Sequence, residues 1–191
     1  DGRCVAIEPG ESIFSGASRA GIPVPKLCYD SRVSASATCR LCMVRVKGRR
    51  LPVASCAQQL EPGMEITTHD TEMDGWRRTI LDLVVSENPE EECVKCVEQG
   101  PCTLHSLATQ FNVAVAPDRF AGVRSGAKPD DANPFILRDY TKCISCYLCT
   151  RICGEVEQAH AITPAGRGFQ TRIVTPFDGG LLDSPCTFCG Q

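Results

Sequence analysis

The sequence predicts an α+β chain built from three small modules, and three observations lead to this fold class. Fourteen cysteines fall into three separate blocks along 191 residues. Apolar residues recur at helical spacing in some segments and alternate, as in strands, in others. Aromatic residues make up only 6% of the chain, so a single large apolar core is not expected. Small modules with weak cores need internal staples, and the cysteines would supply them.

The first module, residues 1–70, is predicted to be a small mixed sheet packed against one helix. Residues 11–20 place apolar side chains at helical spacing, and Gly21 follows where such a helix would end. Alternating apolar residues, bounded by Gly and Pro, predict three strands at 43–46, 51–54 and 65–68.

The N-terminal residues are predicted to be the remnant of a further strand. Val5 to Ile7 are apolar, and a turn follows at Pro9 and Gly10. Cys4 matches no metal-binding spacing, so we expect it to be a small buried apolar side chain in that strand. A start inside a strand leads us to expect further residues before Asp1.

The second module, residues 71–115, is predicted to be helical. Asp74 can cap a helix whose apolar residues extend to the Ser86–Pro89 region. A shorter helix is expected to start near Cys102. Residues 116–134 are rich in Pro, Gly, Ala and Asp without sustained periodicity, which predicts a linker.

The third module, residues 135–191, combines cysteine loops with a predicted hairpin. Its strands are expected at 161–163 and 169–174, with a turn at 166–168. The module therefore completes an α+β chain of three parts.

The spacing of the cysteines favours metal binding over disulfides. Cys-x-x-Cys pairs recur along the chain, and such close pairs suit a shared metal site. The first residues contain no basic segment followed by an apolar core, so no secretory leader is recognised. We therefore expect a reducing, cytoplasmic compartment. The pairs are 39/42, 93/96, 143/146, 146/149 and 186/189.

The first cysteine group is predicted to bind a [2Fe–2S] cluster. Such a cluster needs four thiolates, two for each iron. The small residues at 34–37 let backbone N–H groups approach the cluster sulfides. A four-cysteine zinc site is the alternative for the same residue types. The predicted ligands are Cys28, Cys39, Cys42 and Cys56.

The second group, Cys93, Cys96 and Cys102, is predicted to bind a [4Fe–4S] cluster with three thiolates. Three thiolates leave one iron without a protein ligand, so the fourth ligand is unknown. The local options are His69, His105, Asn88 and the acidic run Glu90, Glu91 and Glu92.

The third group carries the strongest signal, a C-x2-C-x2-C-x3-C run of the bacterial ferredoxin type, in which the fourth cysteine binds a second cluster. Gly154 stands where Pro usually follows this run. One [4Fe–4S] cluster is assigned to Cys143, Cys146 and Cys149, and a second to Cys153, Cys186 and Cys189. Each set lacks one ligand, which we expect beyond Gln191.

Taken together, the three blocks resemble the N-terminal iron–sulfur region shared by the complex I large iron–sulfur subunit, the [FeFe]-hydrogenases and the NAD-dependent formate dehydrogenases. The resemblance implies a β-grasp [2Fe–2S] ferredoxin-like domain, a small helical [4Fe–4S] domain with one His and three Cys ligands, and a two-[4Fe–4S] ferredoxin domain, here incomplete. Asn88 and Pro89 stand where the family has its His ligand. The matching segments are PVPKLCYD, ATCRLCMVRVKGRR, ASCAQQLEPGMEI, CVKCVEQGPCTLH, KCISCYLCTRIC and SPCTFCGQ.

The segments from NPFILRDYTKC to SPC look most like the formate dehydrogenase catalytic subunit. The resemblance therefore implies an electron relay toward flavin- and NAD-binding and further iron–sulfur subunits, with no catalytic site in residues 1–191. The alternatives are a diaphorase subunit of an NAD-reducing hydrogenase, an [FeFe]-hydrogenase and a zinc-stapled interaction module. A net charge of −3 argues against nucleic-acid binding, and no apolar run is long enough to span a membrane.

Overall fold

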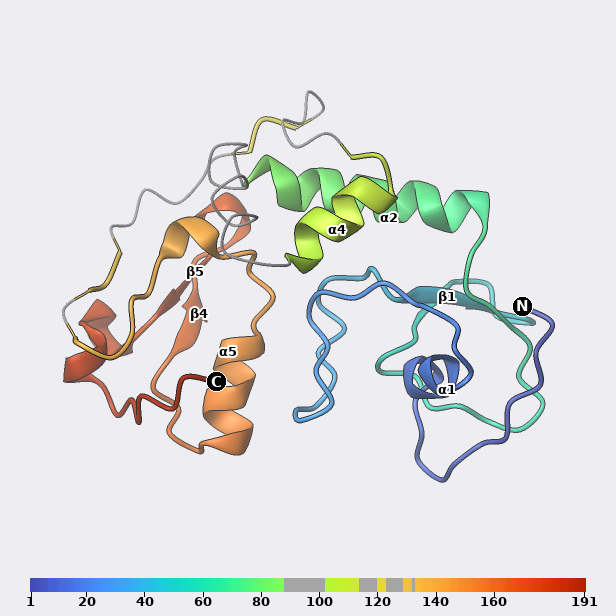
Figure 1. The fold of residues 1–191 in the computed structure, drawn as a ribbon, viewed down its shortest axis with the longest axis horizontal. Coiled ribbons are helices and arrows are strands. Elements are labelled where there is room, and N and C mark those ends of the chain that lie inside the picture. The colour runs from blue at the N-terminus through green and yellow to red at the C-terminus, as the bar shows by residue number, and fades with distance from the viewer. Residues whose placement is uncertain (88–101, 114–119, 123–128, 132) are drawn as a thin grey trace.

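The computed structural model of the chain describes residues 1–87, 102–113, 120–122, 129–131 and 133–191. Figure 1 shows two lobes, one around β1 and α1 and one around β4, β5 and α5, with α2 and α4 lying along one side of the molecule. The helices are α1 (Ile13–Arg19), α2 (Thr71–Ser86), α4 (Thr103–Gln110) and α5 (Leu148–Arg151), which continues as the π-helix η2 (Ile152–Val156). The strands are β1 (Met43–Val46), β2 (Val53–Ala54), β3 (Ile66–Thr67), β4 (Thr163–Ala165) and β5 (Arg172–Val174). Short 3-10 helices are η1 (Tyr140–Lys142), η3 (Gly168–Gln170), η4 (Pro176–Asp178) and η5 (Leu181–Asp183).

The first lobe is a three-stranded antiparallel sheet, in the order β2-β1-β3, packed with α1. Ser12 caps α1 by accepting a hydrogen bond from the Ser15 amide, and Gly21, at φ +69°, ends it. The predicted helix and three strands are confirmed, with shorter second and third strands. The core of this lobe includes Ile13, Ala17, Val24, Cys42, Val44, Val46, Ala54 and Cys56.

The prediction of a strand at Val5–Ile7 is wrong, and so is the burial predicted for Cys4. The segment has no ladder partner, and Cys4 is exposed. Only the Asp1 end reaches β3, where its amino group donates to the Ile66 carbonyl. Further along, the Arg19 side chain donates a hydrogen bond to the Ala6 carbonyl, so a side chain rather than a neighbouring strand satisfies that carbonyl. A cavity of about 860 Å³ separates the segment from the sheet.

Helix α2 begins one turn earlier than predicted, because Asp70 rather than Asp74 caps it. The Asp70 carboxylate accepts a hydrogen bond from the Met73 amide at 2.7 Å. The helix ends at Ser86 and packs against α4, whose N-cap is Cys102, as predicted. These helices share a core with Leu27 and Leu41, near the two ends of the first cysteine loop (residues 27–42). The other members are Leu81, Val85, Leu104, Leu107, Ala108, Phe111 and Val113.

The second lobe contains the predicted hairpin, formed by antiparallel β4 and β5 and turned at Gly166 (φ +76°). The strand predicted at 161–163 begins two residues before β4, and the strand predicted at 169–174 begins three residues before β5. The structure also indicates why a small residue stands at position 154: a Cβ on Gly154 would lie 3.1 Å from His160 Nδ1, a tight contact. None of the described helices is both long and apolar enough to cross a membrane.

Candidate iron–sulfur sites

The four cysteines of the first group lie together as two contacting pairs. The interaction of the Cys39 side chain with Cys28 lowers the pKa of Cys28 to about 5 and raises the pKa of Cys39. The Cys56 side chain acts in the same way on Cys42, lowering its pKa to about 6. All four sulfurs also interact electrostatically. Two pairs of neighbouring thiols are what a cluster with two thiolates per iron requires. Over the described ranges, no three His, Cys, Asp or Glu side chains converge on a position for one metal ion.

The loop between Cys28 and Cys42 turns its backbone amides toward these sulfurs. The Cys39 amide donates to Cys28 Sγ at 3.3 Å, and the Thr38 amide reaches the same sulfur. Ala37 and Arg40 adopt positive φ values of 52° and 60°, which side chains rarely take. Strained backbone of this kind concentrates at functional sites. Backbone N–H groups therefore approach one predicted ligand sulfur, and their predicted approach to the cluster sulfides stays a prediction.

Ser55 supplies a test of whether the site fits a cluster. Its side chain is completely buried beside Cys56, and its hydroxyl forms no hydrogen bond with the described residues. The hydroxyl faces Cys42 closely enough to lower the pKa of that thiol. A buried hydroxyl without a partner is unfavourable unless a strong acceptor lies next to it. The sulfurs of a [2Fe–2S] cluster held by these four thiolates would be that acceptor.

Replacing Ser55 by alanine is expected to lower the reduction potential of the [2Fe–2S] cluster by about 20–60 mV, the one-electron equivalent of one neutral hydrogen bond. The hydrogen bond stabilises the more negative reduced cluster, so its loss favours the oxidised form. A redox titration followed by electron paramagnetic resonance (EPR) measures the shift. Ser18→Ala, at an exposed position on α1, is the control. An unchanged potential in Ser55→Ala would remove Ser55 from the site.

Arg77 holds the backbone on both sides of Cys42. The side chain is only 1% exposed. Its guanidinium donates to the carbonyls of Leu41 at 3.1 Å and Met43 at 2.9 Å. It also donates to the carbonyl of Thr68 at 2.7 Å and pairs with Asp74 at 2.8 Å. Helix α2 therefore fixes the position of a predicted ligand from outside the first module.

Neither Ser55 nor Arg77 was predicted from the sequence as part of a site. A signal for Arg77 exists: Met73, Leu81 and Val85 form a buried stripe on α2 at four-residue spacing, and Arg77 is the single charge within it. A charged residue inside an apolar helix face is almost always paired when buried. Ser55 has a weaker signal, its position directly before a predicted ligand.

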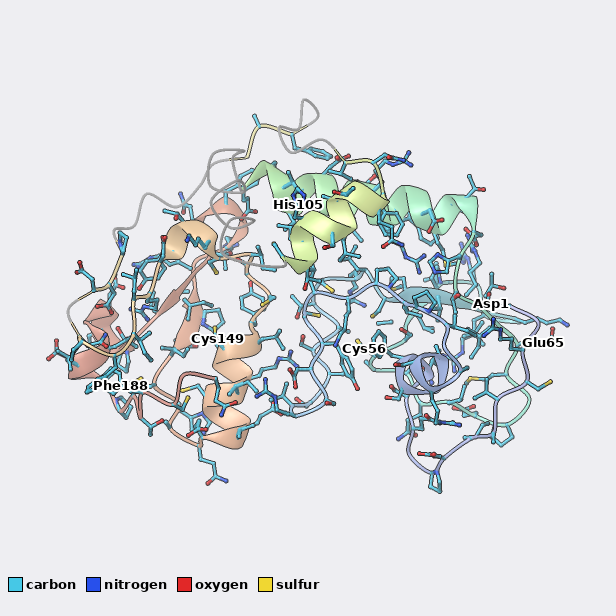
Figure 2. The ribbon with its side chains drawn as sticks, in the orientation of Figure 1. Asp1, Cys56, Glu65, His105, Cys149 and Phe188 are labelled. Carbon is cyan, nitrogen blue, oxygen red and sulfur yellow. The ribbon has the colours of Figure 1, made fainter. Side chains whose placement is uncertain are left out.

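The second cysteine group is described only in part. Cys93 and Cys96, with Asn88 and the run Glu90–Glu92, lie outside the described residues. Cys102 is half-buried and packs against the core shared by α2 and α4. His105 lies one turn further along α4 (Figure 2), and the fourth ligand remains a prediction without an assigned residue.

His69 is a poor candidate for that fourth ligand. Its Nε2 lies 3.0 Å from the Pro23 carbonyl, which can only accept, so Nε2 carries the proton. Nδ1 then accepts a hydrogen bond from Arg77 at 3.0 Å. Both ring nitrogens are therefore engaged, one by the Pro23 carbonyl and the other by Arg77 of α2.

Five of the six predicted ligands in the second lobe line an apolar cavity of about 380 Å³, and Cys146 is not among its lining residues. The side chains of Ile152, Ile173 and Leu181 complete its apolar wall. Desolvation raises the pKa of Cys149 to about 11, and the neighbouring Cys146 and Cys143 add to the effect. Members of both predicted ligand sets therefore face one space. The cysteines that line it are Cys143, Cys149, Cys153, Cys186 and Cys189.

The two Cys-x-x-Cys loops of this lobe have the same local geometry. Ser145 (φ 52°) donates its amide to Cys143 Sγ at 3.4 Å. Phe188 (φ 52°) does the same to Cys186 Sγ at 3.4 Å, and its ring packs on Phe135 at 5.6 Å (Figure 2). The repetition is a structural argument that both loops hold the same kind of group.

Cys153 is held by a third device, the π-helix η2. The Ala161 amide donates to Cys153 Sγ at 3.2 Å, and the carbonyl of Cys153 accepts from the amides of Ala159 and His160. π-helical turns are rare and occur frequently at functional sites. The chain thus directs the Cys153 sulfur inward, toward the cavity that Cys186 and Cys189 also line.

Comparison with known proteins connects these sites to a family. Residues 1–71 match the family described as "2Fe-2S iron-sulfur cluster binding domain". The whole chain aligns at 33% identity with the NADP-reducing hydrogenase subunit HndD of Solidesulfovibrio fructosivorans, covering 33% of that protein. Over 92% of its length it aligns at 30% identity with the NADH-ubiquinone oxidoreductase 75 kDa subunit of Reclinomonas americana, covering 25% of that protein. The chain thus spans a third or less of the length of these relatives.

A solved structure shares the arrangement of the whole chain. The crystal structure of an NAD+-reducing [NiFe]-hydrogenase in the H2-reduced state superposes with a TM-score of 0.85 at 29% identity. The match covers 98% of this chain and 78% of the other. The relative placement of the two lobes and of α2 and α4 is therefore common to both molecules.

Proposed function

We propose that the chain is an iron–sulfur electron relay of a multi-subunit, NAD(P)-linked oxidoreductase. Residues 1–71 match the 2Fe-2S iron-sulfur cluster binding domain family, and the chain is similar to subunits of NADH-ubiquinone oxidoreductase and NADP-reducing hydrogenase. The observation that carries the proposal is the burial of Cys28, Cys42 and Cys56 in one place, with the Cys39 amide on Cys28 Sγ at 3.3 Å and the backbone of Ser55, next to Cys56, bonded to the Cys42 carbonyl. These four thiolates would hold a [2Fe–2S] cluster, which supplies one-electron transfer when bound.

We assign two [4Fe–4S] clusters to the second lobe and one to the second cysteine group. Cys143, Cys146 and Cys149 would hold one cluster, and Cys153, Cys186 and Cys189 the other. The shared cavity and the repeated amide-to-sulfur hydrogen bonds support this assignment. Cys93, Cys96 and Cys102 would hold the third. The chain's own contribution is to bury the clusters and to donate N–H groups to their sulfurs, two means by which proteins tune reduction potentials.

The partners of the relay follow from the proposed role. We propose flavin- and NAD(P)-binding and further iron–sulfur subunits as its electron partners, with no catalytic site in this segment. The formate dehydrogenase assignment rests on the resemblance of the segments around Cys143 and Cys186, whereas two of the similar proteins above are hydrogenases. We therefore carry hydrogen and formate as the two candidate terminal substrates. We propose a reducing, cytoplasmic location, because the close Cys-x-x-Cys pairs suit metal sites rather than disulfides.

The proposal predicts a brown, anaerobically purified protein that holds iron and acid-labile sulfide. On stepwise reduction, EPR should show a [2Fe–2S] signal distinct from those of the [4Fe–4S] clusters. A colourless protein containing zinc would refute the relay and favour an interaction module. Reduction of NAD(P)+ by the intact complex, driven by hydrogen or by formate, identifies the terminal substrate.

A further inference from the structure

The first cysteine loop is held by hydrogen bonds to side chains of the helical segment that carries the third cysteine group. Figure 1 shows this loop extending from the sheet toward α5. Arg151, the last residue of α5, donates from Nη2 to the carbonyl of Cys28 at 2.5 Å and from Nη1 to the carbonyl of Ser34. The contact therefore includes the backbone of a predicted [2Fe–2S] ligand.

Glu155, one turn further on, contacts the same residue of the loop, Ser34. Its two carboxylate oxygens accept from the Ser34 amide at 2.6 Å and from the Ser34 hydroxyl at 2.7 Å. These bonds, and the nearby Arg151, lower the pKa of Glu155. Ser34 thus has its amide, carbonyl and hydroxyl all bonded to side chains of the other lobe. Hydrogen bonds with a charged partner are about twice as strong as neutral ones.

The position of this contact relates it to electron transfer. Arg151 lies two residues from Cys149 and two from Cys153, so the gripping side chains and the predicted ligands share one helical segment. Because Arg151 contacts the carbonyl of Cys28 itself, the first cysteine group lies next to the segment that carries Cys149. Ile144, next to Cys143, packs on the core that contains Leu27 and Leu41, giving a second point of contact.

We propose that Arg151 and Glu155 are positioning residues, a clamp that fixes the separation between the [2Fe–2S] site and the Cys143–Cys149 site and so sets the rate of electron transfer between them. This inference rests on the proposed function. One electron leaves the reduced cluster and reduces its neighbour, and no bond is broken and no proton moves. Neither residue touches a cluster in this role; each acts by holding Ser34 and the Cys28 carbonyl.

The test compares Arg151→Met, Arg151→Lys and Glu155→Gln with the unaltered holoprotein. Glu157→Gln is the matched control, because it makes the same charge change two residues away, where its carboxylate lies 3.5 Å from Thr187 of its own lobe. Iron content and midpoint potentials are measured first. The dipolar EPR interaction between the two reduced clusters then reports their separation, and rapid-mixing spectroscopy reports the transfer rate.

We expect full cluster loading in all variants, with a weaker dipolar interaction and transfer slowed about tenfold or more in Arg151→Met and Glu155→Gln, since each charge-assisted hydrogen bond shifts an equilibrium by about that factor. Arg151→Lys should show a smaller loss, because it keeps the positive charge. Some loss is still expected, since an ammonium cannot span both carbonyls as the guanidinium does. Unchanged coupling and rate in loaded variants would overturn the clamp alone. Cluster loss in every variant would also overturn it, since the residues would then be needed for assembly. An unaltered protein without clusters would refute the proposed function itself.

Discussion

Replacing Cys42 by serine is expected to abolish the [2Fe–2S] EPR signal, or to change it strongly, while the [4Fe–4S] signals persist. Cys42 is 1% exposed and forms one of the two contacting thiol pairs, with Cys56. Its loss leaves one iron of the cluster with a single thiolate, and a serine hydroxyl is a far weaker ligand at neutral pH. The [4Fe–4S] signals persist because their predicted ligands lie elsewhere. EPR of dithionite-reduced protein, normalised to iron content, measures the effect.

Cys4→Ser is the matched control, because Cys4 is exposed and belongs to no cysteine group. We expect its spectrum to equal that of the unaltered protein. A Cys42→Ser variant with an unchanged [2Fe–2S] signal would show that the assignment of the first cysteine group is wrong. Equal loss of every cluster signal would instead indicate that the chain fails to fold without the first cluster.

Replacing Arg77 by methionine is expected to reduce the free energy of unfolding by about 3–5 kcal/mol, the range found when one partner of a buried charged network is removed. The variant leaves the carbonyls of Leu41, Met43 and Thr68 without their donor in a buried site. Each such carbonyl is unfavourable by about 1–3 kcal/mol. Because two of these carbonyls flank Cys42, the [2Fe–2S] cluster should be lost first. Urea unfolding, followed by visible absorbance and by circular dichroism, measures both effects.

Arg49→Met serves as the comparison, since Arg49 is exposed and donates to the Gln58 side chain. We expect it to change stability by less than about 0.5 kcal/mol, as surface substitutions usually do. Arg77→Lys should be intermediate, because an ammonium presents its donors from a point rather than from a planar fork. A loss below about 1 kcal/mol in Arg77→Met would mean that water replaces the guanidinium and that the residue does not organise the site.

The sequence predicted the cysteine groups and most local structure, because both depend on short spacings. The helix at α1, the strand at β1 and the hairpin of the second lobe each follow from periodicity and turn residues within about a dozen positions. Cys28, Cys39, Cys42 and Cys56 lie near one another in the structure, and their role as cluster ligands stays a prediction. The cap of α2 was misplaced by one turn because Asp70 and Asp74 offer the same chemistry to a helix start, and only the extended backbone at Asp70 distinguishes them.

Long-range contacts could not be predicted from one sequence. Whether Val5–Ile7 joins a sheet depends on which side chains satisfy its backbone, and Arg19 is thirteen residues from Ala6. The contact of Arg151 with Ser34 joins residues separated by more than a hundred positions, and nothing in the motif around either residue indicates its partner. The burial of Arg77 likewise depends on carbonyls contributed by distant loops. Such contacts reveal themselves only when the modules are placed together.

The shared core of Leu27, Leu41, α2 and α4 bears on how the chain acquires its native state. A boundary near residue 70 separates the cysteine groups in sequence, but it would cut Leu27 and Leu41 from their apolar neighbours, at about 1.5–3 kcal/mol for each side chain exposed. The same cut removes Arg77 from the Cys42 loop. The smallest cooperative folding unit that includes the [2Fe–2S] site therefore extends at least through α2, and local opening of that helix in hydrogen exchange would loosen Cys42 at the same time.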